Sequence, residues 1–316
     1  AAALLLGIAA LGAFGSRALG KPAPGSEAPV SIACIQPNLP QSARETVESA
    51  ARQYAIVIDA IRAAAARRPD LILVPESSFY GVTWQRSASL RNDLSTIARE
   101  SGASILFNDV DEESDDVYFN AARLVTPSGL APATYRKVHL VPFGEYVPLP
   151  RLFFFMKSVS QAVGAFSAAR APVVLASGRL ALGPAICYEM TYPSLPRVET
   201  RHGANLLVTI SNDAWYGKAG AQEQHFAAMV LRAIENGRPF ARAAITGISG
   251  IVDARGRLLA RIPPDTAGVA AASVVPANVR TVWTLGGGRV FPWSADLLAA
   301  GMVLSAVVRG IRRRRP

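Results

Sequence analysis

Three residues whose types suit acyl chemistry stand where apolar runs of the chain end or a constrained loop begins. Glu76 follows the apolar run 71–74, Cys187 follows the run 180–186, and Lys137 precedes a loop punctuated by prolines. A glutamate can take a thiol proton, a cysteine sulfur can attack a carbonyl, and a lysine can stabilise the resulting oxyanion. Together they predict amide or ester chemistry that passes through a thioester on Cys187 and needs no metal.

Each of these residues also has a plainer structural interpretation. Cys187 would be a small buried hydrophobe, Glu76 a helix cap, and Lys137 a solvated surface charge. Glu145, in Phe-Gly-Glu-Tyr, is either a second acid of the same pocket or a charge on a loop. The catalytic interpretation is favoured by the shared position at strand exits, where α/β folds place functional groups.

The remaining cysteine and the histidines add no second site. Cys34 lies inside an apolar run, between Ala33 and Ile35, and we expect it to be inert. The chain has only these two cysteines, which do not make a disulfide framework, and we expect two free thiols. The three histidines (139, 202 and 225) show no metal-ligand spacing, so we predict neither a metal nor a cofactor. A cysteine–histidine pair of the papain type stays open as an alternative.

The elements that must position these residues follow from the hydrophobic pattern. Apolar runs bounded by turn residues predict strands, and apolar residues at helical spacing predict helices. The predicted strands are 30–35, 71–74, 103–108, 118–125, 131–135, 173–176, 180–186, 206–210, 240–245, 249–253 and 268–274, and the predicted helices are 47–66, 93–101 and 222–236. Strands that alternate with helices and then pair with one another predict a layered α/β fold.

Both ends of the chain are apolar and predict membrane segments. Residues 1–20 are expected to be the end of a membrane helix cut from a longer chain, because no initiating methionine precedes them. A linker, 21–29, leads into a catalytic domain at 30–280. Residues 290–310 predict a transmembrane helix, with Trp293 near its start and a basic tail to residue 316. The alternative for either segment is a helix packed on the core.

The composition agrees with a membrane-associated enzyme and not with a nucleic-acid-binding protein. Half of the residues are hydrophobic, and the mean hydropathy is +0.23, which calls for a membrane segment or a very large core. The net charge of +10 is concentrated in part at the arginine run 309–315. Basic residues beside an apolar span indicate a cytoplasmic end, so the catalytic domain is expected on the outer side. No basic patch is interleaved with aromatics, and nucleic-acid binding is not predicted.

The order of Glu76, Lys137 and Cys187 at strand exits resembles the nitrilase, or carbon–nitrogen hydrolase, superfamily. More narrowly, the chain resembles the apolipoprotein N-acyltransferase family. The segments that carry the resemblance are Lys137 with the loop 139–148, Ile-Cys-Tyr-Glu at 186–189, Ser-Asn-Asp-Ala-Trp-Tyr-Gly at 211–217, Gln-His-Phe at 224–226, and 232–239. The resemblance covers roughly residues 30–275 together with the closing apolar segment.

The resemblance implies a role for each candidate residue. Glu76 would be the general base, Lys137 the oxyanion stabiliser and Cys187 the nucleophile, with Glu145 as a supporting acid. The pair Tyr188–Glu189 would line the pocket beside the nucleophile. The implied fold is a four-layer αββα sandwich, flanked by hydrophobic membrane segments.

The resemblance also implies a reaction with two substrates. A phospholipid would donate an acyl chain to Cys187, and the amine of a diacylglyceryl-cysteine lipoprotein would then accept it. The implied location is the bacterial inner membrane, with the catalytic domain on the periplasmic face. Two alternatives stay open: a nitrilase-fold amidase that hydrolyses a small amide, and an inactive membrane-tethered domain that only binds partners.

Two departures from the family pattern bear on this expectation. The family carries a bundle of membrane helices before the catalytic domain, whereas only residues 1–14 precede it here as an apolar stub. The segment 75–84, Pro-Glu-Ser-Ser-Phe-Tyr-Gly-Val-Thr-Trp, is not the usual continuation after the family's Pro-Glu. We therefore expect this loop to shape a different acceptor or lipid entrance.

Overall fold

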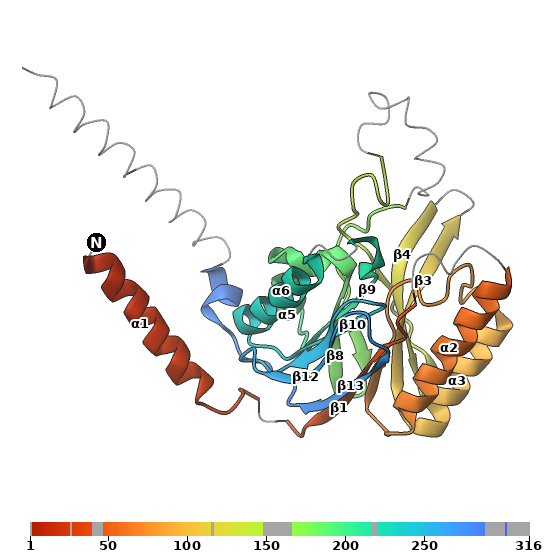
Figure 1. The fold of residues 1–316 in the computed structure, drawn as a ribbon, viewed down its shortest axis with the longest axis horizontal. Coiled ribbons are helices and arrows are strands. Elements are labelled where there is room, and N and C mark those ends of the chain that lie inside the picture. Colours follow the sequence, from red (N-terminus) through yellow and green to blue (C-terminus); the bar gives the residue numbers. More distant parts are fainter. Residues whose placement is uncertain are drawn as a thin grey trace, which may run out of the picture.

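Two β-sheets stacked face to face, with helices on both outer faces, form the body of the protein in this computed structural model (Figure 1). The structure describes residues 2–25, 27–39, 47–114, 117–147, 166–216, 220–287 and 301. Within this part the layers run helix, sheet, sheet, helix, so the predicted α/β fold is confirmed. The predicted membrane helix at 290–310, apart from residue 301, and the basic tail lie outside the described residues.

The first sheet has seven strands among the described residues and carries Glu76 and Lys137. Its order is β13-β1-β2-β3-β4-β5, and β6 pairs with β4. The strands are β1 (Val30–Gln36), β2 (Leu71–Leu73), β3 (Ser104–Ser114), β4 (Val117–Thr126), β5 (Gly129–Leu130), β6 (Tyr135–Arg136) and β13 (Gly268–Val274). Strands β1, β2 and β3 run parallel, with Cys34 opposite Leu73 and Leu73 opposite Leu106. Glu76 follows β2, and Lys137 follows β6 directly.

The second sheet has six strands among the described residues and delivers Cys187. Its order is β12-β11-β10-β9-β8-β7. The strands are β7 (Leu175–Ser177), β8 (Leu180–Ile186), β9 (Leu206–Ser211), β10 (Phe240–Ala244), β11 (Ser249–Val252) and β12 (Leu258–Ile262). The central strands β8, β9 and β10 run parallel. Cys187 comes immediately after β8, so it stands at the carboxyl end of a central strand.

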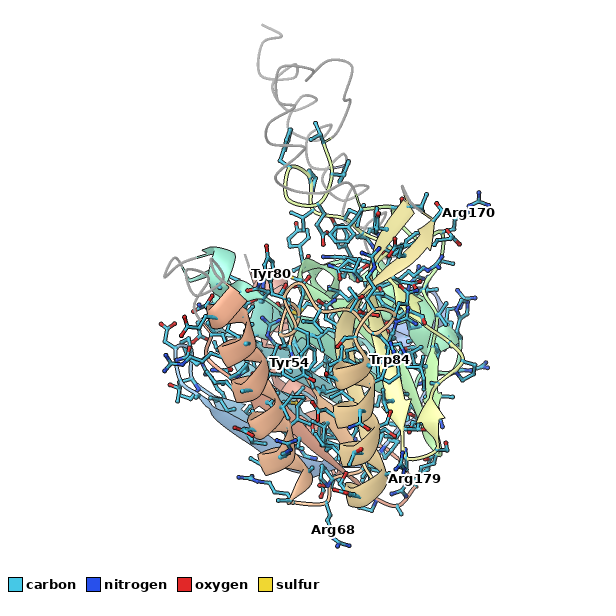
Figure 2. The ribbon with its side chains drawn as sticks, turned by 90° about the vertical axis from the view of Figure 1, so that its right-hand side faces the viewer. Tyr54, Arg68, Tyr80, Trp84, Arg170 and Arg179 are labelled. Atoms are coloured by element: carbon cyan, nitrogen blue, oxygen red, sulfur yellow. The ribbon has the colours of Figure 1, made fainter. Side chains whose placement is uncertain are left out.

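Two helices cover the outer face of each sheet (Figure 1). Helices α2 (Val47–Ala65) and α3 (Ala88–Ser101) pack on the first sheet, and α5 (Ser194–Arg201) and α6 (Ala221–Asn236) pack on the second. Figure 2 views the molecule from the side of α2 and α3, with the labelled rings of Tyr54 and Trp84 at these helices. An apolar core lies between each helix pair and its sheet. The apolar faces of the helices are buried in these cores, and this burial supplies most of the stability of such helices.

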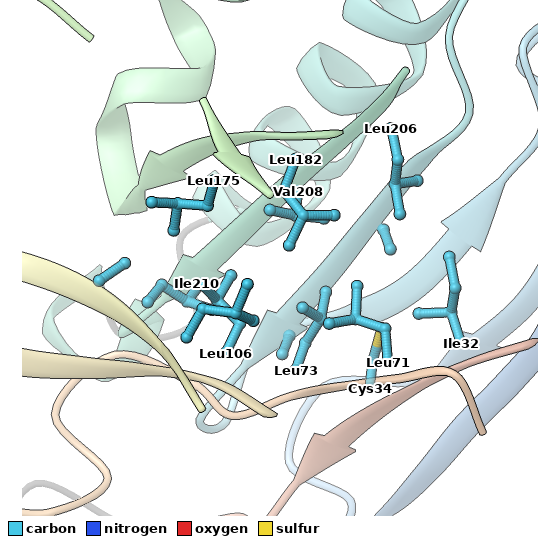
Figure 3. Close-up of a cluster of buried hydrophobic side chains, with 14 of the residues drawn as sticks. Ile32, Cys34, Leu71, Leu73, Leu106, Leu175, Leu182, Leu206, Val208 and Ile210 are labelled. Carbon is cyan, nitrogen blue, oxygen red and sulfur yellow. The ribbon is translucent and has the colours of Figure 1, made fainter. Parts of the chain in front are cut away.

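The inner faces of the two sheets meet in a third apolar core (Figure 3). The first sheet contributes residues such as Ile32 and Leu106, and the second contributes residues such as Leu182 and Val208. Cys34 belongs to this core, and its burial raises the pKa of its thiol well above the usual range. The prediction of an inert Cys34 therefore agrees with its surroundings, and both cysteines are free thiols, as predicted.

The amino-terminal apolar segment is a helix, α1 (Ala2–Leu19). Among the described residues, no helix has both the length and the apolar character that a membrane span requires. The expectation that α1 is the end of a membrane helix thus stays a prediction.

Candidate active site

The three predicted catalytic residues come together at the carboxyl ends of strands from both sheets. Glu76 and Cys187 are each 7% exposed, and Lys137 is 1% exposed. The Lys137 ammonium nitrogen Nζ lies 3.9 Å from Oε1 of Glu76 and 2.8 Å from Oε1 of Glu145. Glu76 lies 61 positions before Lys137 in the sequence, and Cys187 lies 50 positions after it. The fold brings both close enough to interact electrostatically with the Lys137 ammonium. This end of the molecule carries Tyr80 and lies opposite the end that carries Arg68 and Arg179 (Figure 2).

Lys137 is a buried cation held among negative groups. Its burial alone would lower the pKa of the ammonium, but the charges of Glu76, Cys187 and Glu145 outweigh burial, and the pKa is raised. Lys137 therefore keeps its proton at neutral pH. A fixed ammonium in a water-poor site is suited to stabilise an oxyanion that develops nearby.

An asparagine that the sequence analysis did not single out links the two carboxylates. Asn120, on β4, donates from Nδ2 to Oε1 of Glu76 (2.9 Å) and to Oε1 of Glu145 (2.8 Å). Asn108, on β3, donates to Oδ1 of Asn120 at 2.7 Å and fixes the orientation of that amide. One feature of the sequence could have indicated Asn120, namely an asparagine within an apolar strand. A buried side-chain amide requires polar partners, so such a residue points to a polar site nearby.

The carboxylates are also tied to the backbone. The amide of Asn212, directly after β9, donates to Oε2 of Glu76 at 3.0 Å. The amide of Val141 donates to Oε2 of Glu145 at 2.9 Å. Glu76 is therefore linked to both sheets, to the first by its own strand and to the second by β9. These hydrogen bonds hold the Glu76 carboxylate in one orientation.

Cys187 occupies a backbone conformation that non-glycine residues seldom adopt. Its φ is 57°, in the left-handed region. Such conformations persist only where the surroundings enforce them, and they cluster at functional sites. Burial, reinforced by the charge of Glu76, raises the pKa of the Cys187 thiol to about 12, against the opposing charge of Lys137. The resting group is therefore the neutral thiol, so attack on a carbonyl needs a base that removes the proton as the reaction proceeds.

The structure places Glu189 beneath the site and not on its wall. Its side chain is fully buried and accepts hydrogen bonds from the backbone amides of Val138, His139 and Ile186, at 2.7–2.9 Å. The hydroxyl of Tyr135 donates to the same carboxylate at 2.7 Å. Glu189 thus joins the chain just after Lys137 to the chain just before Cys187. Its geometry suits a structural brace between the two sheets.

Tyr188 is half-buried beside Cys187, within a group of rings. Its ring meets Tyr192 edge-on, with centroids 5.4 Å apart, and lies 6.4 Å from His225. Tyr192 in turn stacks on His139 at 4.3 Å. These rings form an aromatic wall next to Cys187.

A second charged cluster, also missed at the level of sequence, borders Cys187 on the side of β9 and β10. Burial alone would raise the pKa of Asp213, but the fully buried Arg242 guanidinium beside it holds that pKa well below its usual range. Ser211 donates to Oδ1 of Asp213 at 2.7 Å. The negative charge of Asp213 adds to the rise in the pKa of Cys187. A side chain at Gly247 would meet Asp213 Oδ2 at 2.0 Å, so this turn requires glycine.

The described residues contain no cluster of three or more histidine, cysteine or acidic side chains able to hold a metal ion. The chemistry that the arrangement itself can perform is nucleophilic. It offers a thiol, a carboxylate to receive its proton and an ammonium to stabilise negative charge.

Known proteins are similar to this chain in sequence and in fold. The sequence model of the carbon–nitrogen hydrolase family matches residues 31–283. The chain is 37% identical over 257 residues to an apolipoprotein N-acyltransferase from Geobacter metallireducens, covering 79% of this chain and 48% of that protein. It is 32% identical over 268 residues to one from Allorhizobium ampelinum, covering 81% of this chain and 50% of that protein. The chain thus spans about half the length of these relatives.

Solved structures show the same fold. An amidase from Nesterenkonia sp. superposes with a TM-score of 0.60 at 21% identity, covering 80% of this chain and 94% of the amidase. A second match is a cysteine-to-alanine mutant of the Nesterenkonia AN1 amidase, described as a member of the nitrilase superfamily. It superposes with a TM-score of 0.62 at 20% identity, covering 86% of this chain and 99% of the amidase. At this level of identity the likeness concerns the fold alone.

Proposed function

The chain belongs to the carbon–nitrogen hydrolase family, and on that premise we propose that it is an acyltransferase that completes lipoproteins. It would move a fatty acyl chain from a phospholipid to the N-terminal amine of a diacylglyceryl-cysteine lipoprotein. The observation that carries this proposal is the buried Lys137, held between Glu76 and Glu145 and coupled to Cys187. Support for the acyl acceptor comes from relatives that are named apolipoprotein N-acyltransferase.

In the first half-reaction Cys187 takes the acyl chain. Glu76 removes the thiol proton while the sulfur attacks the ester carbonyl of the phospholipid. The ammonium of Lys137 stabilises the tetrahedral oxyanion. When this intermediate collapses, the ester C–O bond breaks, and Glu76 returns the proton to the leaving alkoxide. The products are a thioester on Cys187 and a lysophospholipid.

In the second half-reaction the lipoprotein amine accepts the chain. The amine attacks the thioester carbonyl, and Lys137 stabilises the oxyanion a second time. Glu76 takes a proton from the attacking amine and passes it to sulfur as the C–S bond breaks. The result is an amide on the lipoprotein and a free Cys187 thiol. Tyr188, at the aromatic wall, would contact the incoming substrates.

We place the reaction at the periplasmic face of the bacterial inner membrane. The proposal rests on the apolar segment 290–310, which ends within the arginine run 309–315, and on the named relatives. Basic residues after an apolar span favour the cytoplasm, which leaves the catalytic domain on the other side.

The proposal is tested by the intact mass of the detergent-purified chain after incubation with phospholipid. We expect the mass of one acyl chain to be added and then removed by hydroxylamine, which cleaves thioesters. Cys187→Ala should lose the adduct, whereas the matched control Cys34→Ala, in the core, should keep it. An adduct on Cys187→Ala would contradict the assignment of the nucleophile.

The same preparation separates the proposal from the amidase alternative, in which water replaces the amine. Hydrolysis of a small amide without any lipid adduct would support the amidase. If the chain shows neither an adduct nor hydrolysis, it is either an inactive partner-binding domain or a fragment without its lipid-binding helices, and the full-length protein would decide between them.

A further inference from the structure

A basic pocket lies on a different part of the molecule, where the carboxyl ends of α5 and α6 meet the short helical segment η5 (Trp283–Gly287). Its volume is about 400 Å³. It is lined by Thr200, Arg201, Gly203, Arg238, Asn278, Arg280, Thr284 and Leu285. We propose that this arginine pocket binds the phosphate of an anionic phospholipid headgroup. None of its lining residues belongs to the network around Cys187.

The charge of the arginine pocket is strongly one-sided. Three arginines line it, and no lining residue is acidic. Arg201 and Arg280 are exposed, and neither has an ion-pair partner in the part of the chain that the structure describes. One lining residue, Asn278, donates to a carboxylate, that of Glu27, at 3.2 Å. One carboxylate beside three guanidinium groups leaves the pocket positive.

Arg238 is the buried floor of this pocket. It is 3% exposed, and its Nε donates to the carbonyl of Ala204 at 2.7 Å. Its Nη1 donates to the carbonyl of Val279 at 2.6 Å and, at 3.2 Å, to the carbonyls of Asn236 and Gly237. All four of these acceptors for the Arg238 guanidinium are neutral backbone carbonyls. Burial lowers the pKa of Arg238 to about 10, and no described acidic residue forms an ion pair with it.

The geometry of Arg238 leaves donors for a ligand. Among the described residues, its Nη2 has no hydrogen-bond partner, and the side chain lines the pocket. A buried charge is costly unless it is paired. A phosphate oxygen in the pocket would pair with Arg238 and accept charge-assisted hydrogen bonds from the guanidinium groups, which suit phosphate geometry.

Exposed apolar side chains beside the arginine pocket indicate a lipid as the source of the phosphate. Leu285 lines the pocket and is 65% exposed, and Val282, three residues earlier, is 71% exposed. On the neighbouring face of α6, Leu231 and Ile234 are 53% and 48% exposed. In Figure 1 the blue segment that holds η5 lies beside α5 and α6. A phospholipid would cover both the arginines and this apolar strip, whereas a free phosphate would leave the strip in water.

The test is a calorimetric titration of the detergent-purified full chain with dihexanoyl phosphatidylglycerol below its micelle concentration. The chain carries Cys187→Ala, so no lipid is consumed, and the measurement does not depend on the proposed acyl transfer. We expect Arg201→Gln combined with Arg280→Gln to weaken the Kd roughly tenfold or more, which corresponds to about 1.4 kcal/mol. The matched control is Arg67→Gln combined with Arg99→Gln, which removes the same charge from exposed positions just after α2 and on α3. The control should bind as the parent does.

Three results would overturn the inference. The first is unchanged binding in the pocket variant, and the second is an equal loss in the control, which would indicate a general effect of net charge. The third is displacement of the lipid by inorganic phosphate at the same concentration, which would leave a simple anion site. A missing acyl adduct in the mass experiment would count against the proposed function but not against this pocket.

Discussion

At the scale of single residues, the site combines groups that oppose one another electrostatically. Glu76 and Asp213 disfavour a thiolate on Cys187, and Lys137 favours it. Burial is the largest cause of the raised pKa, so the resting thiol is neutral. This balance makes Glu76 both a group that raises the pKa of the Cys187 thiol and the proposed acceptor of its proton.

We predict that Lys137→Met will lose the stabilisation of the oxyanion. Removal of one such donor costs about 10²–10³-fold in turnover in comparable sites. The measurement is the rate of acyl-adduct formation on Cys187 in the purified variant. Lys21→Met, at an exposed position of the linker, serves as the control. A rate close to that of the parent would remove Lys137 from the mechanism.

We also predict opposite effects of Glu76→Gln on the thiol and on turnover. Since the charge of Glu76 raises the pKa of Cys187, its removal should lower that pKa, and iodoacetamide should alkylate Cys187 at a lower pH than in the parent. Turnover should nevertheless fall, because glutamine cannot accept the proton. The pH profile of alkylation, recorded in a Cys34→Ala background, tests this. A midpoint that stays in place or moves to higher pH would contradict the electrostatic argument.

At the scale of elements, the site depends on hydrogen bonds to Glu189 that connect the two sheets. Glu189 accepts hydrogen bonds from the segment after β6 and from the end of β8. It therefore fixes the ends of strands that carry Lys137 and Cys187. This arrangement explains why Glu189, two residues after Cys187, is fully buried and does not face solvent.

These hydrogen bonds to Glu189 lead to a prediction about stability. Glu189→Gln replaces one acceptor oxygen with an amide donor that faces other donors. Leaving two buried donors without acceptors should cost about 2–5 kcal/mol of unfolding free energy. Denaturant unfolding measures this cost, with Glu223→Gln, at a largely exposed side chain of α6, as the control. A loss below that of the control would show that Glu189 is not a brace.

At the scale of the whole molecule, the core between the sheets sets their spacing and so the meeting of the strand ends. Leu182, on β8, and Leu73, on β2, are fully buried in this core on opposite sheets (Figure 3). Protein interiors are close-packed, so a cavity in this core removes packing contacts from both sheets. The sandwich acts as the frame that brings Glu76 to Cys187.

Leu182→Ala is predicted to lower the unfolding free energy by about 2–5 kcal/mol, through lost burial and the cavity that remains. Thermal denaturation of the purified chain measures the effect. Leu258→Ala, at a 53% exposed position of β12, should change stability by at most about 0.5 kcal/mol. Similar losses at both positions would contradict the view that the inter-sheet core carries the stability.

Much of the architecture was predictable, and the exceptions have physical reasons. The strand Leu180–Ile186 was predicted residue for residue, because an apolar run between turn residues is a strong signal. Strand β12 was missed because its burial is slight, and α5 because it is short and contains Pro196. Strand β3 runs on to Ser114 through a polar stretch, where Arg123 on β4 pairs with Asp109 at 2.6 Å and Asp111 at 2.5 Å. Such pairing depends on the neighbouring strand and leaves no periodic trace.

The sequence by itself determined the α/β fold and the positions of Glu76, Lys137 and Cys187 at strand exits, because apolar periodicity and strand ends are local properties. Only the tertiary structure decided which polar groups surround them. Asn120 between two carboxylates, Arg242 against Asp213 and the arginine pocket are made by residues from different elements. Hydrogen bonds and charges act over a few ångströms of space, and only folding brings these side chains within that distance.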